Sequence, residues 1–152
     1  MLFNTCYWGH LFRLVQAYLR VRPDLSNDGS SNLPYLALVS PTEAQMSLPT
    51  TTSTGMTNSR IPTLAARRQI FSFTQVFSPN ISQSAFFANT TLPLIKDLLN
   101  AENGLLFAYG VTNSGKTYTI QGKNNSEEAG ILPRALDVVF NSIEGLQVCN
   151  SL

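Results

Sequence analysis

The segment from Gly110 to Thr117 constrains this chain more than any other, because it fits the pattern G-x-x-x-x-G-K-[S/T]. It follows a short apolar run, Gly104–Tyr109, which predicts a strand buried on both faces of a parallel sheet. Glycines at these positions let the backbone turn tightly and bring its N–H groups close to phosphate oxygens. The sequence therefore predicts a phosphate-binding loop made of Gly110, Val111, Thr112, Asn113, Ser114, Gly115, Lys116 and Thr117.

Two side chains of this loop have expected roles. Lys116 supplies a positive charge for the β- and γ-phosphates, and the Thr117 hydroxyl is the expected protein ligand of Mg²⁺. Such a loop binds phosphate but neither selects the nucleotide nor hydrolyses it. No acidic residue after Thr117 stands at the end of a further buried strand, so the sequence identifies no catalytic residue.

Composition sets the size and class of the fold. With 152 residues and 43% hydrophobic residues, the chain has enough apolar material for the core of one small domain, which excludes wholesale disorder. A formal net charge of +1 gives no global field for nucleic acid or an anionic membrane. Cys6 and Cys149 have no further Cys or His at metal-ligand spacing, and no signal peptide or membrane span is expected. A reducing, cytosolic setting follows.

The segment Val15–Arg22 alternates apolar and polar residues, which predicts a strand with one buried face, ended by Pro23. The buried face is expected to comprise Val15, Ala17, Leu19 and Val21. A turn-rich segment, 24–34, follows it, and Tyr35–Val39 predicts a short second strand.

The middle of the chain is less regular. Ser and Thr contribute ten of the residues from 40 to 59, which predicts a loop or a disordered insertion there. Ile70–Phe77 is rich in aromatic and β-branched residues and predicts one strand. Residues 82–100 predict a helix, with Ser82 or Ser84 as its cap, a kink at Pro93 and an end at Asn103–Gly104.

A polar loop, 122–130, separates the phosphate-binding motif from a second helical pattern that runs from Ile131 to Ile143. Pro133 suits the first turn of that helix. Its apolar stripe is expected to pack in the core, through Leu132, Leu136, Val139, Phe140 and Ile143.

Four segments together resemble the N-terminal half of a kinesin motor domain in order and spacing: Tyr18–Pro23, Phe71–Phe77, Phe107–Thr119 and Gly130–Arg134. The form V-T-N-S-G-K-T is most similar to the mitotic kinesin-like proteins that work at the central spindle in cytokinesis. On this basis residues 14–145 are a partial motor domain with a loop insertion at 40–69, residues 1–13 are unassigned, and 146–152 form a truncated tail.

The resemblance implies a P-loop NTPase of the α/β class, with an incomplete, mostly parallel central sheet flanked by helices. It implies ATP and Mg²⁺ as ligands, and microtubules as the partner along which the complete protein moves, at the cytoskeleton and spindle. The residues that border adenine in the family correspond to Arg20, Arg22, Pro23 and Tyr118. From the residues alone, Arg20 and Arg22 on the polar face of a strand are more often simply solvated. The loop 122–130 corresponds to a surface loop that differs among subfamilies.

Both switch motifs of the family, N-x-x-S-S-R-S-H and D-L-A-G-x-E, are absent, as is its main microtubule-binding region. We therefore expect this chain to be inactive as an ATPase by itself. Two alternatives stay open: a non-catalytic or interfering fragment, and a P-loop protein of another class such as a nucleotide kinase or GTPase. The sequence leaves open a truncated gene model or a short isoform, and sets no oligomeric state.

Overall fold

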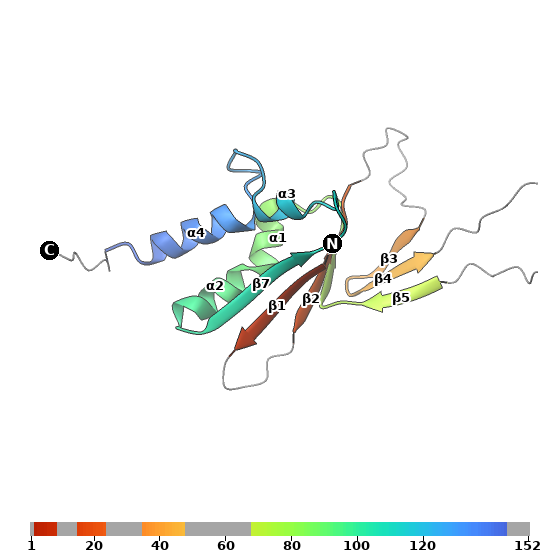
Figure 1. Ribbon diagram of the computed structural model, residues 1–152, viewed down its shortest axis with the longest axis horizontal. Coiled ribbons are helices and arrows are strands. Elements are labelled where there is room, and N and C mark those ends of the chain that lie inside the picture. Colours follow the sequence, from red (N-terminus) through yellow and green to blue (C-terminus); the bar gives the residue numbers. More distant parts are fainter. Residues whose placement is uncertain (1, 9–14, 24–34, 48–67, 146–152) are drawn as a thin grey trace, which may run out of the picture.

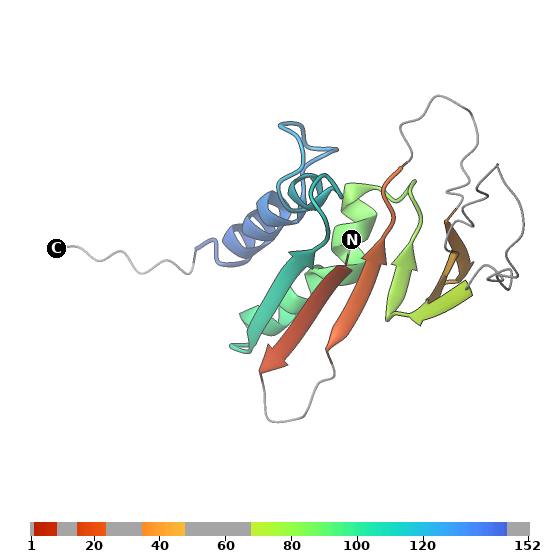
Figure 2. The same cartoon turned by 45° about the vertical axis from the view of Figure 1, so that its right-hand side comes forward.

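The structure is a computed structural model that describes residues 2–8, 15–23, 35–47 and 68–145 (Figure 1). A four-stranded sheet has the order β6-β2-β1-β7, and a smaller sheet has the order β3-β4-β5. The helices gather on one face of the larger sheet (Figure 2). The elements are β1 (Leu2–Trp8), β2 (Gln16–Arg20), β3 (Leu36–Ser40), β4 (Glu43–Ser47), β5 (Arg68–Ser72), β6 (Gln75–Phe77), α1 (Gln83–Thr90), α2 (Leu92–Leu99), β7 (Asn103–Tyr109), α3 (Lys116–Ile120) and α4 (Ile131–Ser142).

The larger sheet is mixed. β2 and β6 are parallel, whereas β1 is antiparallel to both β2 and β7, so three of the four strands run in one direction. Strand β7 was expected to be buried on both faces of a parallel sheet, and this is wrong. Its neighbour is the antiparallel β1, and Leu105 and Tyr109 are 56% and 68% exposed, because the described helices cover only the other face.

Within β2 the faces are the reverse of the prediction, although Val21, directly after the strand, is buried as expected. Tyr18 and Arg20, expected on the polar face, are buried, whereas Val15 is 55% exposed. The reason is the layer of helices: the Tyr18 ring joins the core beside Phe77, and the Arg20 guanidinium finds hydrogen-bond partners there. Burial raises the pKa of the Tyr18 hydroxyl.

Two predictions for the middle of the chain need correction. The segment 70–77 forms two strands, β5 and β6, which belong to different sheets, because Thr74 bends the chain and pairs with Ala17 through its backbone and its hydroxyl. The segment 40–59 is not a loop throughout, since β4 lies within it, pairs with β3 and β5, and buries Ala44. The strand expected near Tyr35–Val39 is confirmed as β3.

The helix predicted over 82–100 is present as two helices. Ser82 caps α1 by accepting a hydrogen bond of 3.1 Å from the Ala85 N–H. Pro93 lies in the first turn of α2, where its missing N–H costs nothing, so the break falls just before it. Helix α2 ends at Leu99 with Asn100 as its C-cap, close to the predicted end of the helical segment, whereas the predicted stop at Asn103–Gly104 is wrong because both residues belong to β7.

Helix α4 is confirmed, with Pro133 in its first turn, but its apolar stripe packs only in part. Val139 lies against the core, whereas Leu132, Leu136 and Phe140 are exposed. The residues buried together in the core are Tyr18, Phe77, Phe86, Phe87, Ile95 and Ile131.

Some predictions fall outside the described residues: the segment 24–34, residues 48–67 of the expected insertion, and the tail 146–152. Strand β1 lies in the N-terminal segment that the sequence left unassigned. None of the helices in the described ranges has the length and apolar character needed to cross a bilayer.

Candidate functional site

The predicted phosphate-binding loop connects the end of β7 to the start of α3. Gly115 precedes the helix with φ of 98°, a left-handed conformation that favours glycine. A Cβ at Gly115 would meet nothing within 4 Å, so backbone conformation rather than space explains this glycine. Asn113, with φ of 64°, is one of the few non-glycine residues of the described chain in this conformation, which asparagine tolerates well.

Two polar groups of the loop are placed to meet an anion. The Lys116 ammonium donates hydrogen bonds of 2.7 Å to the carbonyl oxygens of Gly110 and Val111. The Ser114 hydroxyl is buried and has no hydrogen-bond partner among the described residues. A buried hydroxyl without a partner costs about 1–3 kcal/mol, which a ligand oxygen could recover.

The loop opens onto a cleft of about 930 Å³. Its lining contains three cationic side chains and, among the described residues, no carboxylate, a composition that favours an anionic ligand. The cleft brings together predicted phosphate-site and adenine-site residues from the segment after β2, the loop and α3. The lining residues are Arg22, Pro23, Thr112, Asn113, Gly115, Lys116, Thr117, Tyr118 and Lys123.

Arg22 and Arg20, predicted as a pair, have different surroundings. Arg22 is exposed at the cleft and donates a hydrogen bond to the carbonyl oxygen of Asn113, which ties the end of β2 to the loop. Arg20 is 8% exposed and does not line this cleft. It borders a smaller cavity of about 90 Å³, which Ser114 also lines.

The Arg20 guanidinium lies beneath Tyr118. It donates hydrogen bonds to the side-chain oxygens of Gln83, at 2.8 Å, and of Thr119, at 3.0 Å. Its central carbon is 4.7 Å from the centre of the Phe86 ring and 5.6 Å from that of Tyr118. Burial lowers the pKa of Arg20, although Tyr118 opposes this shift. Arg20 therefore supports Tyr118 from within, and it borders the smaller cavity together with Arg22, Pro23 and Tyr118, the other residues expected at the adenine.

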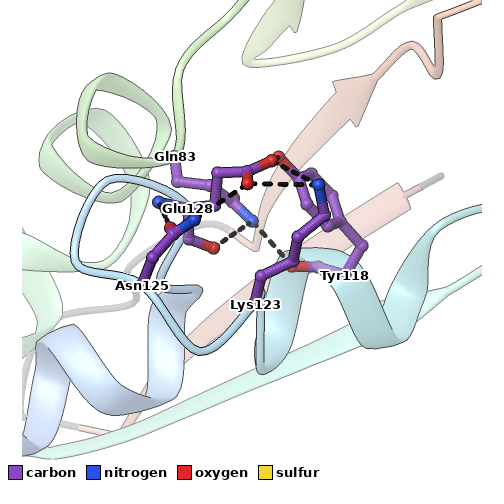
Figure 3. Close-up of polar contacts among 5 residues, drawn as sticks. All are labelled: Gln83, Tyr118, Lys123, Asn125 and Glu128. Carbon is purple, nitrogen blue, oxygen red and sulfur yellow. Dashed lines mark hydrogen bonds and ion pairs between the residues drawn. The ribbon is translucent and has the colours of Figure 1, made fainter.

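Lys123 is a residue of the cleft that the sequence reasoning missed. Its ammonium forms an ion pair of 2.8 Å with Glu128, which also accepts from Asn125 and, at 3.4 Å, from the Tyr118 hydroxyl (Figure 3). The hydrogen bond from Lys123 lowers the pKa of Glu128, and the same bond raises that of Lys123. The available signal was a Lys and a Glu in one short polar loop directly after the motif.

The loop 122–130 folds back on itself between α3 and α4. Gly122 pairs with Ala129, and a Cβ on Gly122 would overlap the backbone of Glu128. A Cβ on Gly130 would come within 2.5 Å of the Ile120 carbonyl oxygen. Arg134, from the first turn of α4, donates to three carbonyl oxygens of the loop, those of Ala129, Ser126 and Glu127.

The residues present fit a magnesium–nucleotide ligand better than a metal held by protein alone. The described ranges hold no group of three or more His, Cys, Asp or Glu side chains that could bind a metal. Thr117 is exposed and lines the cleft beside Lys116. Magnesium keeps water and phosphate oxygens as most of its ligands, so a single protein hydroxyl is sufficient.

Comparison with known proteins gives the family. The kinesin motor domain model matches residues 20–150. Kinesin-like protein KIF20A of Mus musculus is 39% identical over 133 residues, which are 86% of this chain and 14% of that protein. Kinesin-like protein KIF23 of Mus musculus is 48% identical over 77 residues, 51% of this chain and 8% of that protein. The chain thus spans a small part of the relatives it matches.

Solved structures agree. A structure named kinesin 6 is 34% identical with a TM-score of 0.61, and the match covers 82% of this chain and 27% of that one. The structure of a fast kinesin is 24% identical with a TM-score of 0.61, and the match covers 88% of this chain and 34% of that one. At this identity the match shows the fold alone. The resemblance found in the sequence is confirmed: this chain belongs to the kinesin motor domain family.

Proposed function

We propose that the cleft binds ATP together with Mg²⁺, as the nucleotide-binding part of a microtubule-based motor. The observation that carries the proposal is convergence: Arg22 and Pro23 from the segment after β2, the phosphate-binding loop, and Tyr118 from α3 line one cleft. These positions are far apart in sequence, and the family resemblance assigns them to the phosphate and adenine parts of one nucleotide site.

At the phosphate end, Lys116 exchanges its present carbonyl partners, Gly110 and Val111, for phosphate oxygens. The buried Ser114 hydroxyl gains a partner. The Thr117 hydroxyl holds Mg²⁺, which when bound neutralises part of the phosphate charge. The loop glycines keep side chains out of the space where the phosphates lie.

At the base end, two flat groups are available. The Tyr118 ring is 39% exposed at the cleft, and the Arg22 guanidinium is held at its edge by the carbonyl oxygen of Asn113. An aromatic ring and a guanidinium plane both stack on a purine. Pro23 completes this side of the cleft. Arg20, placed beneath the ring, contributes indirectly.

Hydrolysis and movement belong, in this proposal, to the complete motor. There, water attacks the γ-phosphate in line while the loop amides and Lys116 stabilise the transferred group. In this chain no carboxylate lies among the described residues of the cleft, so we assign no catalytic residue and propose binding without turnover. Association with microtubules and the spindle is likewise proposed for the complete protein.

The test is a titration of the chain with a fluorescent ATP analogue in the presence of Mg²⁺. Lys116→Ala removes a charged hydrogen-bond donor, worth about 1.5–3 kcal/mol, so the affinity is expected to fall by about ten- to a hundredfold. Lys96→Ala is the matched control, because Lys96 is an exposed lysine of α2 that does not line the cleft. Unchanged affinity in Lys116→Ala would refute the site, and phosphate release stimulated by microtubules would refute binding without turnover.

A further inference from the structure

Tyr118 is held from two sides by different parts of the chain. Its ring lines the cleft, its backbone oxygen points to one polar group and its hydroxyl to another (Figure 3). The inner contacts come from β2 and α1, and the outer contacts come from the loop 122–130. The two sides differ in burial, and therefore in how readily each can change.

The inner side is rigid. Gln83 is 4% exposed, accepts a hydrogen bond from Arg20, and donates one of 2.7 Å to the Tyr118 carbonyl oxygen. It also reaches the Glu128 carbonyl oxygen at 3.5 Å, so it touches both the ring-bearing helix and the loop. Buried, mutually satisfied polar groups of this kind fix a local geometry. The inner contacts thus set the position of the Tyr118 backbone.

The outer side sets the direction of the side chain. The Tyr118 hydroxyl donates to Glu128, whose carboxylate is itself fixed by Lys123 and Asn125. The Asn125 side chain also accepts a hydrogen bond of 2.7 Å from the Glu128 N–H. The carboxylate is therefore placed by the fold of the loop before any ligand enters.

The charge arrangement separates this cluster from the phosphate end. Lys123 lines the cleft, but its charge is balanced by Glu128 at 2.8 Å. The pair adds little net attraction for phosphate, and it lies at the Tyr118 hydroxyl rather than beside Lys116. We therefore expect the pair to affect the binding of whatever group contacts the Tyr118 ring, rather than the binding of phosphate.

We propose that Glu128, held by the loop 122–130, is a positioning residue that orients Tyr118 and thereby sets the affinity of the cleft for the base of a nucleotide. The inference rests on the function proposed above. With the hydroxyl tethered, the ring is already in place when the base arrives; without the tether, binding must also order the side chain, which weakens it. The loop thus tunes base binding without touching the base.

The experiment compares two ligands, ATP and inorganic tripolyphosphate, each with Mg²⁺, by calorimetric titration of the whole chain. Glu128→Ala is expected to lower the affinity for ATP relative to that for tripolyphosphate by about three- to tenfold, the worth of one hydrogen bond. Lys123, left without its partner, attracts both polyphosphates alike, so the ratio of the two affinities is the quantity compared. Glu127→Ala is the matched control: it removes the neighbouring carboxylate, and its contact within the loop is made by its backbone oxygen, so both affinities should stay as they were.

A second variant, Tyr118→Phe, keeps the ring and the fold and removes only the tethered hydroxyl. It should reproduce the selective loss of ATP affinity, and adding Glu128→Ala to it should cause no further loss, because both changes break the same contact. Equal loss for both ligands, no loss in either variant, or additive losses would overturn the proposal. Binding of tripolyphosphate with no preference for ATP would overturn it while sparing the phosphate site, and binding of neither ligand would refute the function itself.

Discussion

Replacing Arg20 by methionine tests whether the two arginines of β2 have separate roles. Methionine retains the length and apolar stem of the side chain but removes the guanidinium from its buried position under Tyr118. Arg20 is 8% exposed, whereas Arg22 is exposed at the cleft, so Arg22→Met is a matched change in a different environment. We expect the first variant to lose stability and the second to lose nucleotide affinity.

The magnitude follows from the contacts. Arg20 donates to Gln83 at 2.8 Å and to Thr119 at 3.0 Å, and hydrogen bonds from a charged group are worth about 1.5–3 kcal/mol each. Part of this lost stabilisation is regained, because the variant no longer has to desolvate a buried cation on folding. The Gln83 oxygen then loses a buried partner, at about 1–3 kcal/mol. The net expected loss in the free energy of unfolding is about 2–4 kcal/mol.

The assay is urea unfolding followed by far-ultraviolet circular dichroism, without nucleotide, so that ligand binding does not contribute. For a chain of this size the loss corresponds to a fall in Tm of roughly 5–15 °C. Arg22→Met should change the free energy of unfolding by less than about 1 kcal/mol, since its hydrogen bond to Asn113 is exposed. The reasoning is refuted if Arg20→Met costs under about 0.5 kcal/mol, or if the two variants are destabilised equally.

Two further predictions concern the loop and the exposed apolar surface. Gly122→Ala should lower the free energy of unfolding by more than about 2 kcal/mol, because φ of 73° strains any other residue and the new Cβ overlaps the Glu128 backbone. Gly145→Ala is the control: with φ of 82° and nothing within 4 Å of the new Cβ, it should cost about 1 kcal/mol. Equal losses for the two variants in urea unfolding would contradict the overlap. Phe140 is 59% exposed on α4 and should contribute to binding of a hydrophobic dye, so Phe140→Glu should reduce dye binding with little loss of stability. Phe86→Ala removes a fully buried ring and should lower the free energy of unfolding by about 3–5 kcal/mol. A Phe86→Ala variant as stable as the parent chain would contradict this account of the core.

The phosphate half of the site could be predicted from sequence because its determinants are local. Gly115 must adopt a left-handed conformation, and Lys116 and Thr117 follow it directly, so a pattern of eight residues contains both the turn and its chemistry. In the structure these three residues line the same cleft. Backbone geometry fixes such a loop with little help from the rest of the chain.

The faces of the strands were harder to predict, for a physical reason. Alternation in β2 gives two possible faces, and hydrophobicity favoured the one with Val15 and Leu19. The observed choice depends on partners beyond the strand: Tyr18 packs beside Phe77, and Arg20 donates to the side-chain oxygens of Gln83 and Thr119. Nothing within the strand itself indicates that such partners exist.

The base half of the site shows the same dependence on distant contacts. Arg22 meets Asn113 across 91 positions of sequence, and Arg20 meets Gln83 across 63 and Thr119 across 99. Each of these hydrogen bonds joins segments far apart in sequence, and the hydrophobic pattern of one segment gives no information on its contacts with another. The family resemblance supplied the correspondence of Arg20 with the adenine site, but only the structure shows that its bonds go to the groups that hold Tyr118.

This division has a consequence for how the site can vary. The loop proposed to bind phosphate depends on backbone conformations that few substitutions tolerate. The support of Tyr118 depends on side chains from the loop 122–130, whose backbone is fixed by Gly122, Gly130 and Arg134. Changes in that loop that keep its closing residues can alter the tether at Glu128 without disturbing Lys116. Base affinity can therefore change independently of phosphate affinity, because the two rest on contacts that share no side chain.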